Sequence, residues 1–145
     1  MLLTGTFSRS VDEKLRIALP KPLRDGLVTG GNGLVYIAPG TDGSLAVYAE
    51  EAFGRLAQRV AEASPTEKDV RAFARLFYSR AQAAELDRQG RMRLPGELAT
   101  WAQIKREAVL VGVRDHVELW APERWKAYLA ETQDRFDDLA ESALG

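Results

Sequence analysis

The sequence has no cysteine and a single histidine, His116, among its 145 residues. The absence of cysteine excludes disulfides, thiolate metal ligands and cysteine nucleophiles, and it suits a reducing compartment. One histidine excludes a multi-histidine metal site within one chain and leaves no histidine-based triad, so we interpret His116 as a turn residue between two strands. The sequence therefore predicts a protein that is not an enzyme and that uses no metal or cofactor.

Long hydrophobic runs are also missing. No stretch approaches the roughly 18 consecutive apolar residues of a membrane helix, and the N-terminus lacks the basic and apolar segments of a secretion signal. Hydrophobic residues make up 46% of the chain and charged residues 28%, a balance typical of folded globular domains and not of disordered ones. We expect a cytoplasmic protein without a membrane partner.

Excess positive charge is absent as well, because the formal net charge is −1. Binding to nucleic acid normally needs clustered lysine and arginine. The charge is nevertheless polarised along the chain: residues 9–24 carry five basic and two acidic side chains, whereas residues 115–145 carry eight acidic and three basic ones. A local basic surface is therefore compatible with an acidic total.

The clearest positive feature is an internal repeat. The segments Asp12–Pro20 and Asp87–Pro95 share the pattern Asp-x-x-x-Arg-apolar-x-Leu-Pro. Later segments match in the same order: Leu34–Ile37 with Val109–Gly112, then Leu45–Tyr48 with Val117–Trp120. Extra residues in the first copy fall in the Gly/Asp turn at 39–44, where a repeat tolerates them. The pattern predicts a duplicated unit of strand, turn, strand, short helix, hairpin and helix.

Within each copy, the strand after the turn has two different faces. Ile17 and Leu19 alternate with Arg16, and Arg91 and Arg93 alternate with apolar residues in the same way. One face is therefore expected to be buried and the other to be offered to solvent or a ligand. A proline then stops each strand and allows a short helix to start.

Three longer helices are expected from apolar residues at helical spacing. The first follows Glu50, the second opens at Ser64–Glu67, which has the form of a capping box, and the third is one long helix opened by Pro122. We interpret their apolar stripes as core or subunit contacts: Phe53, Leu56, Ala57 and Val60; Val70, Phe73, Ala74 and Phe77; Trp125, Tyr128, Leu129, Phe136, Leu139 and Ala140. Strands with segregated helices predict an α+β fold.

Other polar features have structural interpretations. Gly30–Gly33 is read as a turn, because no Gly-Lys-Ser/Thr sequence follows to make a phosphate loop. The carboxylates of the last helix are interpreted as a solvated face: Asp134, Asp137 and Asp138. Asp12 and Asp87 open the repeated turns, where each can hydrogen-bond its own backbone as an Asx-turn.

The motif arginines, Arg16 and Arg91, allow two interpretations from the residues alone. Presented twice per chain, they could contact phosphates or read guanine in the major groove. They could equally pair with Asp12 and Asp87 and only hold the turns. The residues leave these two interpretations evenly balanced.

The doubled Asp-x-x-Gly-Arg turn, the following Leu-Pro, the start Gly5-Thr6-Phe7 and the stretch from Val109 to Trp120 resemble the MraZ family over essentially the whole chain. The resemblance implies a duplicated AbrB-like swapped-hairpin fold, with β-barrel units and flanking helices. It also implies assembly into a homo-oligomeric ring, and control of the bacterial division and cell-wall gene cluster through repeated promoter boxes. The implied partner is double-stranded promoter DNA, and the implied location is cytoplasmic and nucleoid-associated.

The resemblance also selects site residues. It places Arg16 and Lys14 of the first copy and Arg91 of the second against DNA. Weaker candidates for the same surface are Arg9, Arg88 and Arg93. Turn-structural roles are expected for Asp12, Asp87 and Gly90.

The first copy departs from the family pattern at one position, because Leu15 stands where the pattern has glycine. A position that requires positive φ penalises a residue with a side chain. The sequence therefore predicts either a remodelled first turn or a different direction for Arg16.

We divide the chain into a first repeat with its helix at 1–63, a connecting helix at 64–78 and a second repeat with a C-terminal helix at 79–145. The alternative function is an AbrB-like protein-interaction module of the antitoxin kind. A long basic or disordered partner-binding tail would favour that alternative, and none is visible.

Overall fold

A computed structural model describes residues 2–28 and 33–145. The turn predicted at Gly30–Gly33 lies outside the described residues except for Gly33. The elements of the first repeat are β1 Thr6–Ser10, β2 Arg16–Ala18, α1 Lys21–Val28, β3 Leu34–Pro39, β4 Leu45–Ala49 and α2 Glu50–Glu62. Helix α3, Lys68–Arg80, leads into the second repeat.

The second repeat has the same order of elements as the first. It contains β5 Gln82–Glu85, β6 Arg91–Arg93, α4 Gly96–Trp101, β7 Glu107–Val113, β8 His116–Trp120 and α5 Pro122–Thr132, followed by the 3-10 turn η1 Gln133–Arg135 and α6 Phe136–Leu144. In both repeats the short strand stops before Leu-Pro and a short helix follows, as the missing proline N–H predicts. The predicted duplication is confirmed.

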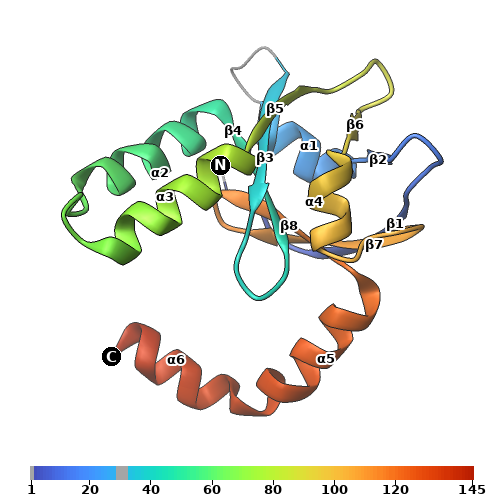
Figure 1. The fold of residues 1–145 in the computed structure, drawn as a ribbon. Coiled ribbons are helices and arrows are strands. Elements are labelled where there is room, and N and C mark those ends of the chain that lie inside the picture. The colour runs from blue at the N-terminus through green and yellow to red at the C-terminus, as the bar shows by residue number, and fades with distance from the viewer. Residues whose placement is uncertain (1, 29–32) are drawn as a thin grey trace.

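The two repeats exchange strands (Figure 1). The main sheet has the order β1-β7-β8-β4-β3-β5, and all of its pairings are antiparallel. Strand β1 of the first repeat pairs with β7 of the second, while β5 of the second pairs with β3 of the first. This exchange confirms the predicted swapped-hairpin α+β fold.

A second, two-stranded sheet joins β2 to β6, and we call it the ribbon. Its inner side chains, Ile17 and Met92, are 0% and 1% exposed and belong to one core cluster with Val35, Leu110 and Leu119 of the main sheet. Burying each such side chain contributes about 1.5–3 kcal/mol. The core thus holds the ribbon and the main sheet together.

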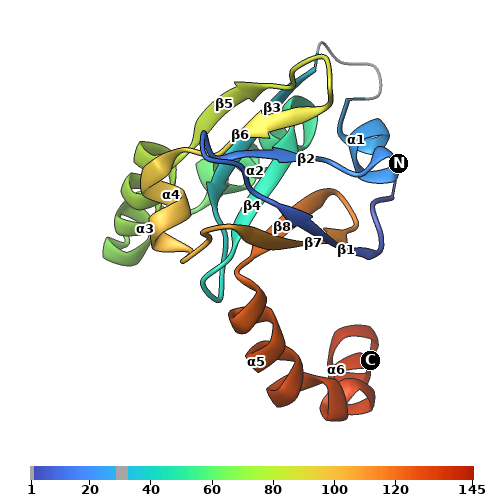
Figure 2. The same ribbon diagram turned by 90° about the vertical axis from the view of Figure 1, so that its right-hand side faces the viewer.

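The helices that follow β4 and β8 differ in how much of their length packs against the sheet. Phe53 of α2 stacks on Tyr36 of β3, with ring centroids 4.4 Å apart. Phe77 of α3 stacks on Phe53 in turn, with ring centroids 5.9 Å apart. Trp125 of α5 packs on Trp120 of β8, with ring centroids 5.2 Å apart. From there α5, η1 and α6 extend away from the sheet as an arm, which Figure 2 shows in profile. In the described part of the chain, none of the helices is long and apolar enough to cross a bilayer.

Three local predictions were wrong. Helix α3 begins at Lys68, not at Ser64, because the Glu67 N–H donates to the Ser64 carbonyl and closes a separate turn. The helix opened by Pro122 is interrupted by η1. His116 is a strand residue of β8, paired with Tyr48 and Val113, so the predicted turn is shorter than expected.

The first turn keeps its shape despite Leu15. Leu15 has a φ of 61° and Gly90 a φ of 74°, so both occupy the left-handed region. The Leu15 N–H donates to the Asp12 carbonyl at 2.9 Å, and the Gly90 N–H donates to the Asp87 carbonyl at 3.0 Å. Neither predicted departure is found, and Leu15 bears a conformational cost of about 1–2 kcal/mol.

Different neighbours explain why only one turn accepts a side chain. A Cβ on Gly90 would meet the guanidinium of Arg24 from α1. The position equivalent to Arg24 in the second repeat is Ala99, which is buried in the core cluster against which Leu15 packs. In each turn the residue with positive φ is thus matched in size to the side chain that it faces on the short helix of the other repeat.

This match predicts a non-additive pair of substitutions. Gly90→Leu should destabilise the fold by about 1–2 kcal/mol through its φ alone, and by more because Arg24 must move. In the double variant Gly90→Leu/Arg24→Ala the steric part of that loss should disappear. Urea unfolding of the wild type, both single variants and the double variant measures the coupling. Strictly additive losses would contradict the match.

Candidate nucleic-acid interface

The outer face of the ribbon gathers three of the five predicted arginines. In the antiparallel pairing Arg16 lies opposite Arg93, and Ala18 lies opposite Arg91. Since neighbouring residues of a strand point to opposite faces and Ile17 is buried, these arginines share the outer face. Pairing between residues far apart in sequence therefore creates a basic surface that neither repeat has alone.

Asp12 orients Arg16. Its Oδ1 accepts the backbone N–H groups of Lys14 and Arg16 at 2.9 and 2.8 Å, which makes an Asx-turn. Its Oδ2 accepts Arg16 Nε at 2.7 Å and lies 4.0 Å from Arg91 Nη1. Because the close bond to Arg16 uses Nε, the guanidinium keeps its terminal Nη donors for a second acceptor.

The second turn repeats this geometry. Asp87 Oδ1 accepts the backbone N–H groups of Gln89 and Arg91, both at 2.9 Å, and its Oδ2 accepts Arg91 Nε at 2.8 Å. The side chains of Arg16 and Arg91 remain 34% and 30% exposed. The aspartates thus fix the arginines without covering them, so the two interpretations of these arginines are compatible.

Both aspartates are held in the charged state. The backbone N–H of Arg16, with its guanidinium and the Lys14 N–H, lowers the pKa of Asp12 below its usual 3.8, against an opposing effect of desolvation. The backbone N–H of Arg91, with its guanidinium and the Gln89 N–H, lowers the pKa of Asp87 in the same way. Hydrogen bonds to a charged carboxylate favour its ionised form.

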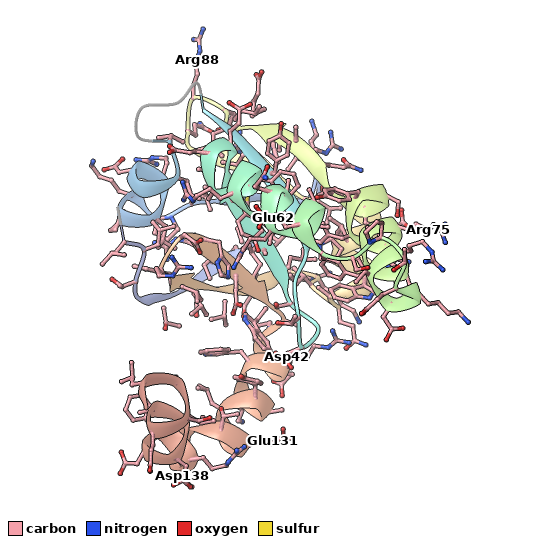
Figure 3. All side chains as sticks on the ribbon, turned by 90° about the vertical axis from the view of Figure 1, so that its left-hand side faces the viewer. Asp42, Glu62, Arg75, Arg88, Glu131 and Asp138 are labelled. Carbon is pink, nitrogen blue, oxygen red and sulfur yellow. The ribbon has the colours of Figure 1, made fainter. Side chains whose placement is uncertain are left out.

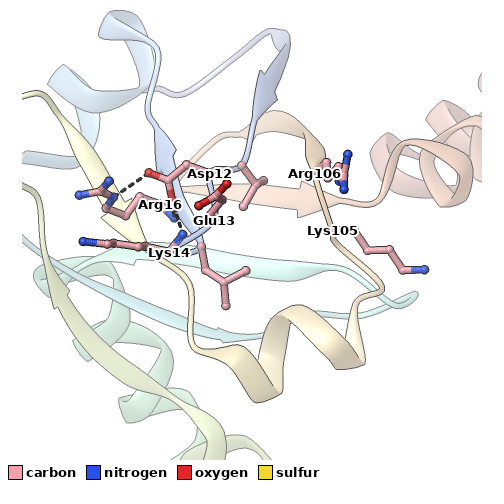
Figure 4. A pocket seen from close by; sticks show the side chains of 8 residues that line it. Asp12, Glu13, Lys14, Arg16, Lys105 and Arg106 are labelled. Atoms are coloured by element: carbon pink, nitrogen blue, oxygen red, sulfur yellow. Dashed lines mark hydrogen bonds and ion pairs between the residues drawn. The ribbon is translucent and has the colours of Figure 1, made fainter.

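An open hollow of about 740 Å³ lies beside the first turn (Figure 4). Lys14 and Arg16 line one side, and Lys105 and Arg106 face them from the segment before β7. The sequence analysis missed Lys105 and Arg106. The only signal was two consecutive basic residues ahead of a predicted strand, and nothing local shows that this pair meets the first turn.

The remaining predicted residues lie outside the ribbon. Arg88 projects from the tip of the second turn (Figure 3). Arg9 lies on β1, where its guanidinium is 5.8 Å from the centre of the Phe7 ring. The structure therefore brings together Arg16, Arg91 and Arg93, adds Lys14 at the adjoining turn, and leaves Arg9 and Arg88 at separate positions.

Comparisons with known proteins agree on one family. A family model for the MraZ protein, described as antitoxin-like, matches residues 2–76 and again residues 77–145. The chain is 36% identical over 143 residues to the "Transcriptional regulator MraZ" of Ligilactobacillus salivarius, covering 99% of this chain and 97% of that protein. The protein of the same name from Moorella thermoacetica is 38% identical over 144 residues, covering 99% and 97%. That of Lactiplantibacillus plantarum is 37% identical over 140 residues, covering 97% and 96%.

The lowered pKa values of the two turn aspartates predict a pH-dependent stability. A carboxylate whose pKa falls on folding stabilises the fold above its unfolded pKa, and that contribution is lost as the pH falls through the folded pKa. Asp12→Asn and Asp87→Asn should therefore lower the melting temperature most near about pH 7 and least near about pH 3. Thermal unfolding by circular dichroism at several pH values measures this. Glu13→Gln, in the same turn, is the matched control, and a pH-independent loss in the aspartate variants would contradict the assignment.

Proposed function

Since the chain belongs to the MraZ family, whose relatives are named transcriptional regulators, we propose that it binds promoter DNA in a sequence-specific way. The proposed targets are repeated boxes upstream of its own division and cell-wall gene cluster, in the nucleoid, bound by a ring-shaped homo-oligomer. The proposal contains no catalytic step. The single observation that carries it is the outward arginine face of the ribbon.

A two-stranded ribbon has the right dimensions for the major groove of DNA. Arginine is the side chain best suited to reading guanine there, because its fork can bond two acceptors on one base edge. On the ribbon, Arg16, Arg91 and Arg93 project from one face. Asp12 and Asp87 hold two of these guanidinium groups in fixed orientations, which lowers the entropy lost when they bind.

Other basic residues are suited to the phosphate backbone. Lys14, Lys105 and Arg106 surround the hollow beside the first turn. Contacts with phosphate fix the register of a protein on DNA but carry no sequence information. We assign sequence reading to the ribbon arginines and positioning to these residues and to Arg88 at the tip of the second turn.

A ring would multiply one modest site. A single ribbon presents few base contacts, so a chain binding alone would have limited affinity. Several ribbons on one assembly that engage several boxes would raise the avidity without new contacts, provided that their spacings agree. The repeated boxes proposed as targets would meet this requirement.

The test compares variants that separate reading from positioning. Arg93→Ala and Arg91→Ala should each weaken binding to the promoter by about 5- to 150-fold, since a bidentate base contact discriminates by about 1–3 kcal/mol. Lys105→Ala should weaken binding to promoter and scrambled DNA alike and reduce the salt dependence by about one phosphate contact. Fluorescence anisotropy titrations at two salt concentrations measure both effects.

Arg55→Ala is a suitable control, because Arg55 is a 60% exposed residue of α2 far in sequence from both turns. Arg124 is unsuitable, because it donates to the carbonyls of Gly43 and Trp101 and supports the fold. Equal binding of the wild type to promoter and scrambled DNA would sink the proposal and favour a protein-interaction module.

A further inference from the structure

The arm carries an apolar face exposed to solvent. Phe136, Leu139 and Leu144 of α6 are 71%, 40% and 88% exposed. Figures 1 and 2 both show α6 away from the sheet and from α3. A contiguous set of large apolar side chains on a surface marks an interaction site more often than chance exposure.

The same helix is acidic. Helix α6 contains Asp137, Asp138 and Glu141 and no basic residue, so its formal charge is −3. Figure 3 shows Asp138 on the side of the arm that points away from the sheet. A partner for this helix should therefore combine an apolar surface with positive charge.

A groove elsewhere on the chain has that combination. Helices α2 and α3, the strands β4 and β8, the turn between β3 and β4 and the end of α4 line a groove of about 560 Å³. Its large apolar and aromatic lining residues are Tyr48, Leu56, Phe73, Leu76, Phe77 and Trp101. Three of these, Phe73, Leu76 and Trp101, are 49%, 56% and 37% exposed. Most large apolar side chains exposed in the described residues thus fall on this groove or on α6.

Charge distinguishes the groove from the arm. Helix α3 contains four basic residues and one acidic residue, a formal charge of +3. Arg80 lines the groove opposite one carboxylate, that of Glu118 on β8, and Arg75 adds positive charge on the exposed surface of α3 (Figure 3). Opposite charges at the rim of an interface steer association and fix its register.

We propose that α6 of one copy docks into this groove of the next copy, head to tail. The inference rests on the proposed ring and names the two surfaces that close it. An interface between two different surfaces of one chain propagates from copy to copy, and it closes into a ring when the rotation allows. The ribbon belongs to neither surface, so it stays available to DNA in the assembly.

A complementation experiment tests this interface. Leu139→Asp damages only the arm, and Leu76→Asp damages only the groove. Each variant alone should be a monomer, while an equimolar mixture should form a heterodimer and nothing larger. The reason is that one intact arm meets one intact groove, whereas the other junction is damaged on both sides. Native mass spectrometry and light scattering measure the masses, and circular dichroism verifies that each variant is folded.

Leu2→Asp is the matched control, because Leu2 is 74% exposed and belongs to neither surface. It should assemble as the wild type does. Three results would overturn the proposal: a monomeric wild type, which would leave the groove to another partner; folded arm and groove variants that still assemble; or a mixture that stays monomeric.

The absence of cysteine permits a second test that leaves the charges unchanged. The double variant Leu76→Cys/Leu139→Cys, treated with a short bis-maleimide, should give a ladder of covalently linked copies. Each single cysteine variant should remain largely unlinked. Absence of a ladder from an assembled double variant would place the contact elsewhere. Promoter binding is measured separately, so an assembled wild type without promoter preference would contradict the proposed function and leave the interface standing.

Discussion

The exchange of strands between the two repeats is the constraint on which the rest of the structure depends. Strand β1 pairs with β7 and β5 pairs with β3, so each repeat supplies the edge strand beside the hairpin of the other. The ribbon is also shared, since β2 and β6 come from different repeats. Its inner side chains enter the same core as the sheet. Loss of either repeat would leave the other with unpaired strand edges and an open core.

The repeated aspartate turns set the direction in which two of the ribbon arginines point. An Asx-turn closes the backbone before each ribbon strand, and the second carboxylate oxygen of the same aspartate bonds the arginine that begins the strand. One side chain thus sets both the backbone and the direction of the guanidinium. The first turn keeps this geometry at Leu15 with a positive φ, which shows that the hydrogen bonds and the packing outweigh a conformational cost of about 1–2 kcal/mol.

Charge is sorted by element more sharply than the net charge of −1 suggests. The ribbon and its first turn carry arginine and lysine, α3 is basic, and α6 is acidic. These elements have different neighbours: the ribbon faces outward from the core, whereas α3 borders an apolar groove and α6 has an exposed apolar face. The acidic total is therefore no obstacle to a basic binding surface, because the opposite charges lie on separate parts of the molecule.

The sequence by itself determined the duplication, the alternation that buries Ile17 and Met92, the prolines that end the ribbon strands and the aspartates that open the turns. All of these depend on interactions within a few residues, which leave a local pattern. Only the tertiary structure decided that Arg16 faces Arg93, that Lys105 and Arg106 meet the first turn, and that His116 lies in a strand. Tertiary structure also decided that Leu15 is accepted where the pattern has glycine. The physical reason is that these features come from pairing and packing between residues distant in the chain, which the exchange of strands brings together and which no local pattern records.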